Sequence, residues 1–469
     1  MGSTFSGLST ALSSLYTQRR ALDVTGQNVA NANTEGYTRQ RVEMQATSAT
    51  PVPAVHSVHN GAGGGVTVSD VSRLRDSFLE SRGRAEHAQA SYLSAQQSTF
   101  TRLENVFAEP SDTALAAQLG DFWAGWGDVA NQPKNEAVRA QLLERGAVVA
   151  DGLRVAHDAL SAQWSSTRVQ LDSYASDVNS AADAVALLNQ TIMQQKSAGL
   201  PSNELADQRD LRLMELAELT GATTASREDG TVDVYVGGSS LVTGGVARHL
   251  VVTGARQLAT ESSDKVQFRW DSPTGLVASV SGGTLAAGLD TLGTTIPEYA
   301  GKLDQVAAAL ADKVNTQHRL GYGMDGVAPA GDLFVNTAGG AGITARTIGV
   351  GITNPRQLGV SASPGAVDGS NADKLADVMK LADGPDAAYR SLVVGLGVSA
   401  QTAQRRADIQ LRVAADMDTL RSADAGVNLD EEMTNMISFQ RAYEAAARVL
   451  TSVDEMLDVL INRTGLVGR

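Results

Sequence analysis

Histidine is the side chain in this sequence best suited to binding a metal or moving a proton near neutral pH. The chain has 469 residues and six histidines, and only His56 and His59 lie close together. A zinc site needs at least three protein ligands, and no third candidate lies near this pair in the sequence. The segment is therefore interpreted as a solvated loop, and we predict no metal site.

A glycine-rich run, Gly61–Gly65, follows that histidine pair. Phosphate-binding loops contain Gly-Lys followed by Ser or Thr and lead into a helix. Here the run precedes Val66–Val68, whose pattern indicates a strand. We therefore predict a flexible connector. The sequence also lacks the Gly-x-Ser-x-Gly elbow that carries a nucleophilic serine.

Two groups of charged residues could support acid–base chemistry. Glu431 and Glu432 lie where a helix is expected to begin, and capping together with the helix dipole explains them. Asp207, Arg209 and Asp210 are expected to form ion pairs on a helix surface, in preference to a site. We predict no catalytic residues, no cofactor and no enzymatic activity.

The composition narrows the possible partners. The formal net charge is −14, aromatic residues make up 4% of the chain, and cysteine is absent. An acidic surface without a basic stripe argues against nucleic acid and anionic membrane as partners. Disulfides and thiol chemistry are excluded, and no run of about 18 apolar residues could span a bilayer. Abundant small residues favour long helices over aromatic-lined pockets.

The N-terminal segment has the heptad spacing of a coiled-coil helix. Its apolar positions recur every seventh residue, with an alternate position filled in the first turns: Leu8, Leu15, Leu22 and Val29, with Phe5 and Leu12. The cluster Asn31, Asn33, Thr34 and Gly36 predicts a turn after this helix. Residues 37–45 are then expected to form a strand.

The C-terminal segment has a matching apolar stripe. Asn428 and Glu431 predict a capping box at its start. Apolar positions then alternate at spacings of three and four: Met436, Phe439, Tyr443, Ala446, Leu450, Val453, Leu457 and Leu460. This spacing places them on one face of a helix.

The two terminal helices are expected to pair, within one chain or between subunits. Residues 1–41 carry Arg19, Arg20, Arg39 and Arg41, whereas residues 424–462 carry eight acids. The backbone entropy of ordering either end exceeds the gain from burying one stripe, so both ends are predicted to be mobile in the free monomer and to fold against neighbours. The alternative is two ordinary amphipathic helices packed on their own domain.

Between the ends, the pattern predicts a mainly α protein with an inserted β module. Helices are expected at residues 70–109, 112–130, 135–196, 203–220, 289–318, 370–382 and 386–423. The predicted division is a terminal helical assembly domain (1–65 and 425–469), a helical trunk (66–220, 286–320 and 367–424) and a β-rich outer module (221–285 and 321–366). Paired terminal coiled-coil helices, an elongated helical-bundle trunk and a small outer β domain make up this architecture.

Three segments resemble the flagellar rod, hook and hook-associated axial proteins. Residues 22–41 are similar to the N-terminal signature of that family, residues 427–461 to its C-terminal signature, and residues 65–79 to the segment that follows the first helix. The N-terminal match is carried by Asn28, Ala30, Asn31, Asn33, Thr34, Gly36 and Tyr37.

Further likenesses favour a hook-associated member of the family. These are Thr38-Arg39-Gln40 directly after Gly36-Tyr37, residues 202–237 and residues 284–334. One departure is that the outer domain, which the family often carries as an insertion, is expected to be absent or reduced. The alternatives are another axial protein, of the hook or the distal rod, and a soluble helical-bundle enzyme or adaptor.

The resemblance implies a structural subunit of the junction between hook and filament, exported unfolded without a cleaved signal peptide and located outside the cell. It also implies self-association through the terminal helices, contact with the hook protein and a second hook-associated protein, and an export chaperone at the C-terminal helix. The expected assembly interface comprises Phe5, Leu8, Leu12, Leu15, Leu22, Asn28, Val29, Asn31, Asn33, Thr34, Gly36, Tyr37, Met436, Phe439, Tyr443, Ala446, Leu450, Val453, Leu457 and Leu460.

Overall fold

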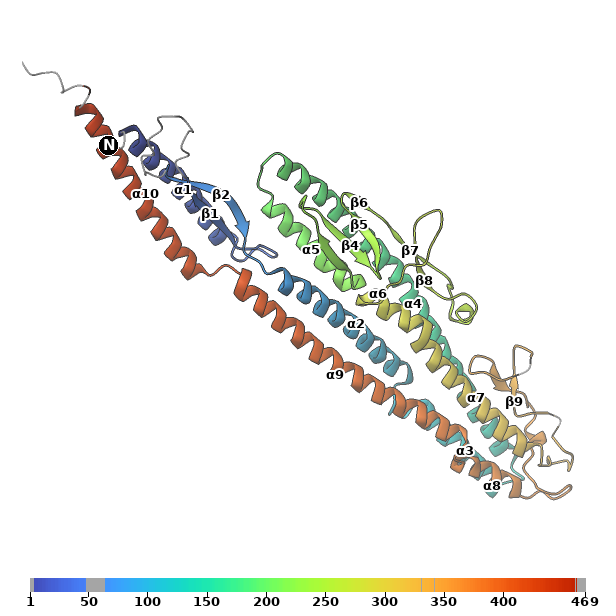
Figure 1. Cartoon of the computed structure of the whole chain (residues 1–469). Helices are drawn as coiled ribbons and strands as arrows, with labels where there is room; N and C mark the ends of the chain where they lie inside the picture. The colour runs from blue at the N-terminus through green and yellow to red at the C-terminus, as the bar shows by residue number, and fades with distance from the viewer. Residues whose placement is uncertain (1–3, 48–63, 330, 341, 460, 462–469) are drawn as a thin grey trace, which may run out of the picture.

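The molecule is a long, narrow helical rod (Figure 1). The computed structural model describes residues 4–47, 64–329, 331–340, 342–459 and 461. The expectations for His56, His59, Gly61–Gly63 and Leu460 therefore lie outside the described residues. None of the helices in the described part of the chain combines the length and the apolarity that a membrane span needs.

The two chain ends pair at one pole of the rod. The elements there are α1 (Thr4–Ala30), β1 (Gln40–Ala46), β2 (Val66–Arg73) and α10 (Leu429–Asp458). Helix α1 packs along α10, and the antiparallel β1–β2 hairpin packs beside α1 (Figure 1). Gly7 lies against Val453 and Asn28 bonds to Glu432, so the two helices run antiparallel. The predicted pairing of the terminal helices occurs here within one chain.

The trunk is built from helices that run along the rod. They are α2 (Ser77–Phe107), α3 (Leu115–Asn131), α4 (Glu136–Ser197), α5 (Asn203–Thr220), α6 (Gly283–Asp290), α7 (Ile296–His318), α8 (Ser370–Ala376) and α9 (Pro385–Ala425). A short π-helical segment, Thr291–Thr295, joins α6 to α7. Helix α9 leads into α10 through Gly426 and Val427, and α2 packs along its length.

The first trunk helix begins later than the sequence pattern predicts. Residues 70–73 complete β2, where Asp70 pairs with Glu43 and Arg73 with Gln40. Asp76 then caps α2, because its carboxylate accepts the backbone N–H of Phe78 over 2.7 Å. The prediction of a helix from residue 70 was therefore wrong, since cross-strand pairing with β1 outweighs the local helical pattern.

An aromatic cluster forms the core at the other end of the rod. Trp123 and Trp126, which the sequence places in the helical core, are both buried. Phe122 packs against both indoles and against Phe334. The indole N–H of Trp123 donates to Asp386 on α9 over 2.9 Å, which satisfies its polar edge.

The β-rich segments form small sheets on the side of the trunk. One sheet has the order β3-β4-β5-β6, and two further pairs are β7 with β8 and β9 with β10. Their bounds are β3 Thr223–Ser226, β4 Val232–Val236, β5 Ser239–Thr243, β6 Val246–Ala247, β7 Leu250–Thr253, β8 Gln267–Trp270, β9 Phe334–Asn336 and β10 Ile348–Val350. The hairpin predicted at Asp229-Gly230 joins β3 to β4, with Gly230 at a φ of 89°.

The two β-rich segments do not form one sheet, which corrects the expectation of a single outer module. Sheet β3–β6 and the pair β7–β8 lie beside the C-terminal half of α4, whereas β9–β10 lies beside the aromatic cluster (Figure 1). The continuous helical run Gly283–His318 separates them. At 1.5 Å per residue this run is about 50 Å long, so the segments that precede and follow it leave the trunk at distant points.

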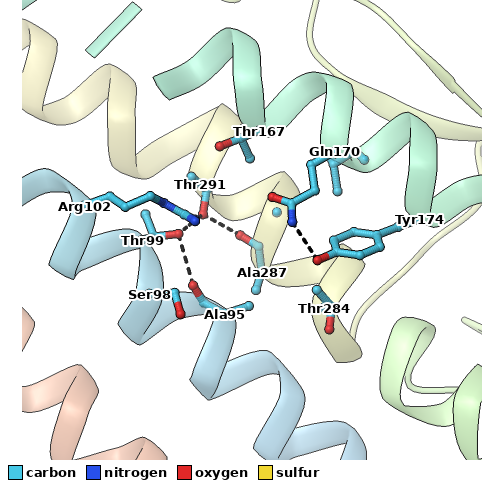
Figure 2. Close-up of a pocket in the computed structure, with 12 residues that line it drawn as sticks. Ala95, Ser98, Thr99, Arg102, Thr167, Gln170, Tyr174, Thr284, Ala287 and Thr291 are labelled. Carbon is cyan, nitrogen blue, oxygen red and sulfur yellow. Dashed lines mark hydrogen bonds between the residues drawn. The ribbon is translucent and has the colours of Figure 1, made fainter. Parts of the chain in front are cut away.

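A small polar cavity lies inside the trunk between α2, α4 and α6 (Figure 2). The hydroxyl oxygens of Thr99 and Thr291 lie 3.1 Å apart there, and each hydroxyl can donate its one proton to the carbonyl four residues earlier in its helix or to the other hydroxyl. The cavity volume is about 130 Å³, well below the roughly 300–1,000 Å³ of typical ligand sites. We interpret it as a small polar gap in the packing of the three helices.

Candidate functional site at the paired termini

The apolar seam of α1 is only partly covered by α10. The predicted seam residues Leu8, Leu15, Leu22 and Val29 are half-buried, and Leu12 is 43% exposed. The side chain of Phe5 is not among those described. The deepest contacts are made instead by small residues, Ala11, Ala21 and Val24. Small side chains let α1 approach its neighbours closely and leave the larger seam residues at the edge of the contact.

The apolar stripe of α10 is likewise only partly covered by α1. Ala446 and Val453 are buried, whereas Tyr443 is exposed. The half-buried members are Met436, Phe439, Leu450 and Leu457. Other apolar side chains on α10 are exposed: Met433, Ile437, Val449, Met456 and Val459. One partner helix cannot cover this much apolar surface, so the terminal pair presents an apolar face to its surroundings.

Oppositely charged residues of the two chain ends meet where α1 ends and α10 begins, and not along the length of the paired helices. None of the ion pairs in the described part of the chain joins Arg19 or Arg20 to α10. Between the described residues of the two ends, ion pairs join Arg39 to Glu431 and to Glu432, each over 2.7 Å. Among the described residues, the opposite charges of the two ends therefore meet at Arg39, whose partner Glu432 is buried and whose partner Glu431 is 58% exposed.

Asn28 is the centre of the root of the terminal pair, which we define as the contact region of Asn28, Tyr37, Arg39, Gln40 and Glu432. Its amide nitrogen donates to the Gln40 carbonyl over 2.9 Å and to Glu432 over 3.0 Å. Its amide oxygen accepts the Gln40 N–H over 3.0 Å and the Tyr37 hydroxyl over 2.8 Å. An amide has two donors and an oxygen with two lone pairs, so every hydrogen-bonding position of Asn28 is used.

Arg39 links the two ends of the chain to the trunk. Its guanidinium binds Glu431 and Glu432, and its N–H donates to the Ala425 carbonyl over 3.0 Å. Burial lowers the pKa of Arg39, but hydrogen bonds and charge from Glu431 and Glu432 outweigh burial and raise it. Glu432 is 2% exposed and thus depends on Arg39 and Asn28 for compensation of its charge.

The capping of α10 agrees with the sequence only in part. Asn428 caps the helix by accepting the N–H groups of Asp430 and Glu431. The Glu431 side chain binds Arg39 and does not complete a capping box. The two glutamates therefore do more than complement the helix dipole, since they hold the N-terminal turn against α10.

The charged group on α5 also differs from its prediction. Asp207 and Arg209 are buried, so these are not surface ion pairs. Arg73 of β2 binds Asp207 and Asp210, each over 2.8 Å, and Asp207 accepts the Thr38 N–H. Burial raises the pKa of Asp207 although Arg73 opposes this shift. The sequence indicated charged residues on α5 but could not show that the hairpin covers Asp207.

Arg209 has a separate structural role. Its guanidinium donates to Asn189 on α4 over 3.0 Å and to the Gly230 carbonyl over 2.7 Å. Burial lowers the pKa of Arg209 to about 10. The residue therefore ties α5 to α4 and to the β3–β4 turn.

The turn after α1 uses the residues of the N-terminal signature. Gly36 has a φ of 76°, and a Cβ built there would lie 2.6 Å from Leu211 Cγ on α5. Asn31 donates to the Gln27 carbonyl, and Thr34 donates to Asn31. Asn33 is exposed. Glycine is therefore required at position 36 both by its backbone angle and by the close approach of α5.

Tyr37 completes the turn. Burial, reinforced by the nearby carboxylates of Asp207, Glu204 and Glu432, raises its pKa to about 12. The hydroxyl therefore stays protonated and donates to Asn28 at all physiological pH values.

Sequence reasoning missed the contacts of two residues of this region, Asn203 and Arg75. Asn203 of α5 donates to the Gln40 side chain over 3.1 Å and to the Val71 carbonyl over 2.7 Å, which fixes the hairpin to the trunk. Arg75 adds an ion pair to Asp210. The only sign of these contacts in the sequence was the pair Arg73 and Arg75 shortly before the cap of α2. Their partners on α5 are more than 130 residues away in the chain.

The region has the properties of a structural joint. Within the described residues, no group of three or more His, Asp or Glu side chains is arranged to hold a metal. The buried polar groups instead bind one another across α1, the hairpin, α5 and α10. A helical rod whose two ends pair at one pole, present an apolar face and are fixed by buried ion pairs is a structural assembly subunit.

Comparisons with known proteins identify the family. A family profile described as the flagellar hook-associated protein FlgK helical domain matches residues 100–334. A profile of the flagellar basal body rod proteins matches residues 8–38. A profile of the C-terminal region of the flagellar basal body rod FlgEFG proteins matches residues 423–463. Flagellar hook-associated protein 1 of Bacillus subtilis is 31% identical over 516 positions that cover 100% of both chains. The chain belongs to the flagellar hook-associated protein 1 family and is a structural component of the bacterial flagellum.

Other relatives agree with this assignment. Flagellar hook-associated protein 1 of Escherichia coli is 24% identical, over 97% of this chain and 99% of its own. The solved structure of the flagellar hook junction protein FlgK from Burkholderia pseudomallei has the same fold, with a TM-score of 0.63 at 16% identity over 73% of this chain and 99% of that one. The alignment with the Bacillus subtilis relative spans 516 positions, more than the 469 residues here, so that relative carries segments that this chain lacks.

Proposed function

We propose that this flagellar structural protein assembles at the junction between hook and filament through the incompletely covered faces of α1 and α10. The observation that supports this most directly is the half-burial of both apolar stripes in the single chain. A neighbouring subunit that supplies the missing surface would bury them fully. The protein acts without catalysis, because its terminal region offers contact surface for neighbouring subunits.

The proposed interface has two kinds of residue. The seam and stripe residues contact neighbouring subunits: Phe5, Leu8, Leu12, Leu15, Leu22, Val29, Met436, Phe439, Tyr443, Ala446, Leu450, Val453, Leu457 and Leu460. The signature residues hold the geometry of the terminal pair: Asn28, Asn31, Asn33, Thr34, Gly36 and Tyr37. The hydrogen bonds of Asn28 and the φ of Gly36 support the second role.

The partners follow from the position in the flagellum. They are other copies of this chain, the hook protein, a second hook-associated protein and an export chaperone that binds the C-terminal helix before assembly. The subunit is exported and ends outside the cell. The structural relative from Burkholderia pseudomallei is named a flagellar hook junction protein, and this supports the same position for the present chain.

The proposal keeps the roles predicted for the three regions of the rod, with one change. Residues 1–65 and 425–469 assemble, the trunk forms the wall, and the β-rich segments face outward. Because β2 pairs with β1, the hairpin through Arg73 belongs with the assembly region.

Disruption of the gene tests the proposal. We expect electron micrographs to show hooks without filaments, and flagellin to accumulate in the medium. Restoring the intact gene should restore filaments. Normal filaments on cells that lack the protein would contradict the proposed function.

A further inference from the structure

A polar cleft of about 730 Å³ lies where the loop between α4 and α5 meets strand β2 and the β3–β4 turn. The loop is at the end of the trunk that faces the terminal pair (Figure 1). The cleft volume is within the roughly 300–1,000 Å³ of typical ligand sites. None of the described residues that line it is aromatic, so the cleft offers no flat ring on which a nucleic-acid base would stack.

The cleft is positively charged although the chain as a whole is acidic. Among the described lining residues, the only acid is Asp70, whose carboxylate accepts the N–H of Val71. The cations that line the cleft are Arg20, Arg73, Arg75, Lys196, Arg209 and Arg227. A concave surface with this excess of cations attracts anions.

Nearby acids neutralise some of these cations. Carboxylates outside the cleft bind three of them, which are Arg73, Arg75 and Arg227. Asp229, in the β3–β4 turn, is close to Lys196. Within the described residues, no ion pair is formed by Arg20 or Arg209. The uncompensated charge of the cleft therefore belongs to these two arginines.

Arg209 is the buried member of the group, with 3% exposure. Within the described residues its hydrogen bonds come from Nη1 alone, and both acceptors are neutral oxygens, of Asn189 and of the Gly230 backbone. Its Nε is buried without a partner. The Nε and Nη2 edge of a guanidinium binds an oxyanion through two parallel hydrogen bonds. Because a buried cation is costly without an opposite charge, this edge favours an anion beside it.

The N-terminus of α5 opens on the same cleft. Ser202, the residue before the helix, lines the cleft and makes no capping bond with its side chain. The N–H groups of the first turn have no acceptor within the helix, and with the helix dipole they attract an anion. Glu204, the acid of this turn, lies near Tyr37 and does not line the cleft. Ser202 and Arg209 are about 10 Å apart along α5 at 1.5 Å per residue, so the site suits an anion with more than one charged group.

We propose that this cleft binds a small multivalent oxyanion of the phosphate class, with one charged group at Arg209 and another at the N-terminus of α5. Arg20 and Lys196 add positive charge at the rim. The bound anion joins the α4–α5 loop, the β3–β4 turn and β2, and so fixes the hairpin of the assembly region to the trunk. The site is complete in a single chain and does not depend on the proposed function.

Titration of the purified full-length chain with inorganic pyrophosphate tests the site. The midpoint of thermal unfolding should rise with the pyrophosphate concentration, because the ligand binds the folded chain. Sodium chloride at the same ionic strength should have little effect. Pyrophosphate should also slow amide exchange at residues 199–205 and 227–232, and not in α7. An equal response to the two salts, or slowing confined to other segments, would overturn the proposal.

Two neighbouring arginines of α1 provide a matched pair of variants. Arg20 lines the cleft, whereas Arg19 is exposed and does not line it. Arg20→Gln should raise the dissociation constant for pyrophosphate about threefold, which is the loss expected for one charge at the rim. Arg19→Gln removes the same charge and should leave the dissociation constant unchanged. Equal effects of the two substitutions would show a response to overall charge alone, and the site would be refuted.

Substitutions at the two ends of the cleft test where the anion sits. Arg209→Gln should raise the dissociation constant about tenfold or more, since it removes hydrogen bonds from a charged donor. Ser202→Asp places a carboxylate at the start of α5, where it caps the helix and repels a second anion. The Ser202→Asp chain should unfold at the same temperature as the intact chain or higher in chloride, and should gain nothing from pyrophosphate. Because this variant keeps Arg209 and its structural bonds, normal pyrophosphate binding by it would contradict the proposed site.

Discussion

The side-chain amide of Asn28 donates a hydrogen bond of 3.0 Å to the buried carboxylate of Glu432, which joins residues 404 positions apart in the chain. The contact lies where α1 ends and α10 begins. Asn28 also binds the first residue of β1, and Glu432 binds Arg39. The beginning and the end of the chain are thus fixed together by the same few side chains that fix both to the trunk.

Replacement of Asn28 by alanine should loosen the whole terminal pair. It removes the Asn28 partner of the Gln40 backbone groups and of the Tyr37 hydroxyl and leaves Glu432 with only Arg39, which should cost about 2–4 kcal/mol of local stability. Amide exchange at β1 and in the first turn of α10 measures this. Tyr37→Phe removes only one of the bonds and should cost about 1 kcal/mol. Equal effects of the two substitutions would contradict the central role of Asn28.

Gly36→Ala should destabilise the protein for two separable reasons. The new Cβ would lie 2.6 Å from Leu211 Cγ, and the φ of 76° disfavours any side chain. Adding Leu211→Ala should relieve the clash and leave about 1–2 kcal/mol from the backbone angle, as measured by urea unfolding. Gly26→Ala is the matched control, because nothing lies within 4 Å of a Cβ there; it should stabilise α1 by up to about 1 kcal/mol. Full tolerance of Gly36→Ala would refute the argument.

Replacement of Leu450 and Leu457 by aspartate should abolish filament attachment. Both side chains are half-buried in the α10 stripe, and charges there would oppose contact with α1 and with neighbouring subunits. The aromatic core lies at the other end of the rod, so thermal unfolding of the trunk should be unchanged. Thr451→Asp, at an exposed position of the same helix turn, should leave attachment intact. Normal swimming by the double variant would count against the proposed interface.

Amide exchange in the free monomer should be faster in α1 and α10 than in α7. The terminal helices have half-covered apolar faces, whereas one whole face of α7 is buried. Few buried contacts mean a low free energy of local opening. Assembly should slow exchange at both ends. Protection in the monomer equal to that of α7 would show that the chain ends need no neighbours.

Trunk stability should fall as the pH drops from about 6.5 to 4. Burial lowers the pKa of His318 to about 4, and its Nε2 accepts the Gly359 N–H over 3.0 Å. In this window the unfolded chain binds a proton on His318 and the folded chain does not, so protonation favours unfolding. His318→Gln cannot titrate. Its unfolding free energy should therefore change less between pH 7 and pH 5 than that of the intact chain, by about 2 kcal/mol.

Features with a local cause could be predicted from the sequence. Helix α5 spans Asn203–Thr220 as expected, and Asp229-Gly230 forms its hairpin turn, because propensity and turn chemistry act within a few residues. The apolar spacing of the terminal segments predicted two long helices that pair. The resemblance singled out Asn28, Gly36 and Tyr37, although their bonding became clear only in the structure.

Features set by distant contacts could not be predicted. Residues 70–73 look helical alone and become a strand because β1 pairs with them. Asp207 and Arg209 were expected to form ion pairs on the helix surface, but they are buried because the hairpin and the β3–β4 turn cover α5. Arg39 carried no local sign of its partners, which lie some 390 residues further along the chain.

The pairing of both chain ends at one pole has a practical consequence for labelling (Figure 1). A fluorescent protein or affinity tag fused to either end of the chain would lie close to the paired helices through which the subunit is proposed to assemble. The turn at Pro273 and Thr274, by contrast, is exposed on the side of the rod, and nothing lies within 4 Å of a Cβ at the adjacent Gly275. Reporters inserted there would leave the pole clear and would mark the side of the rod.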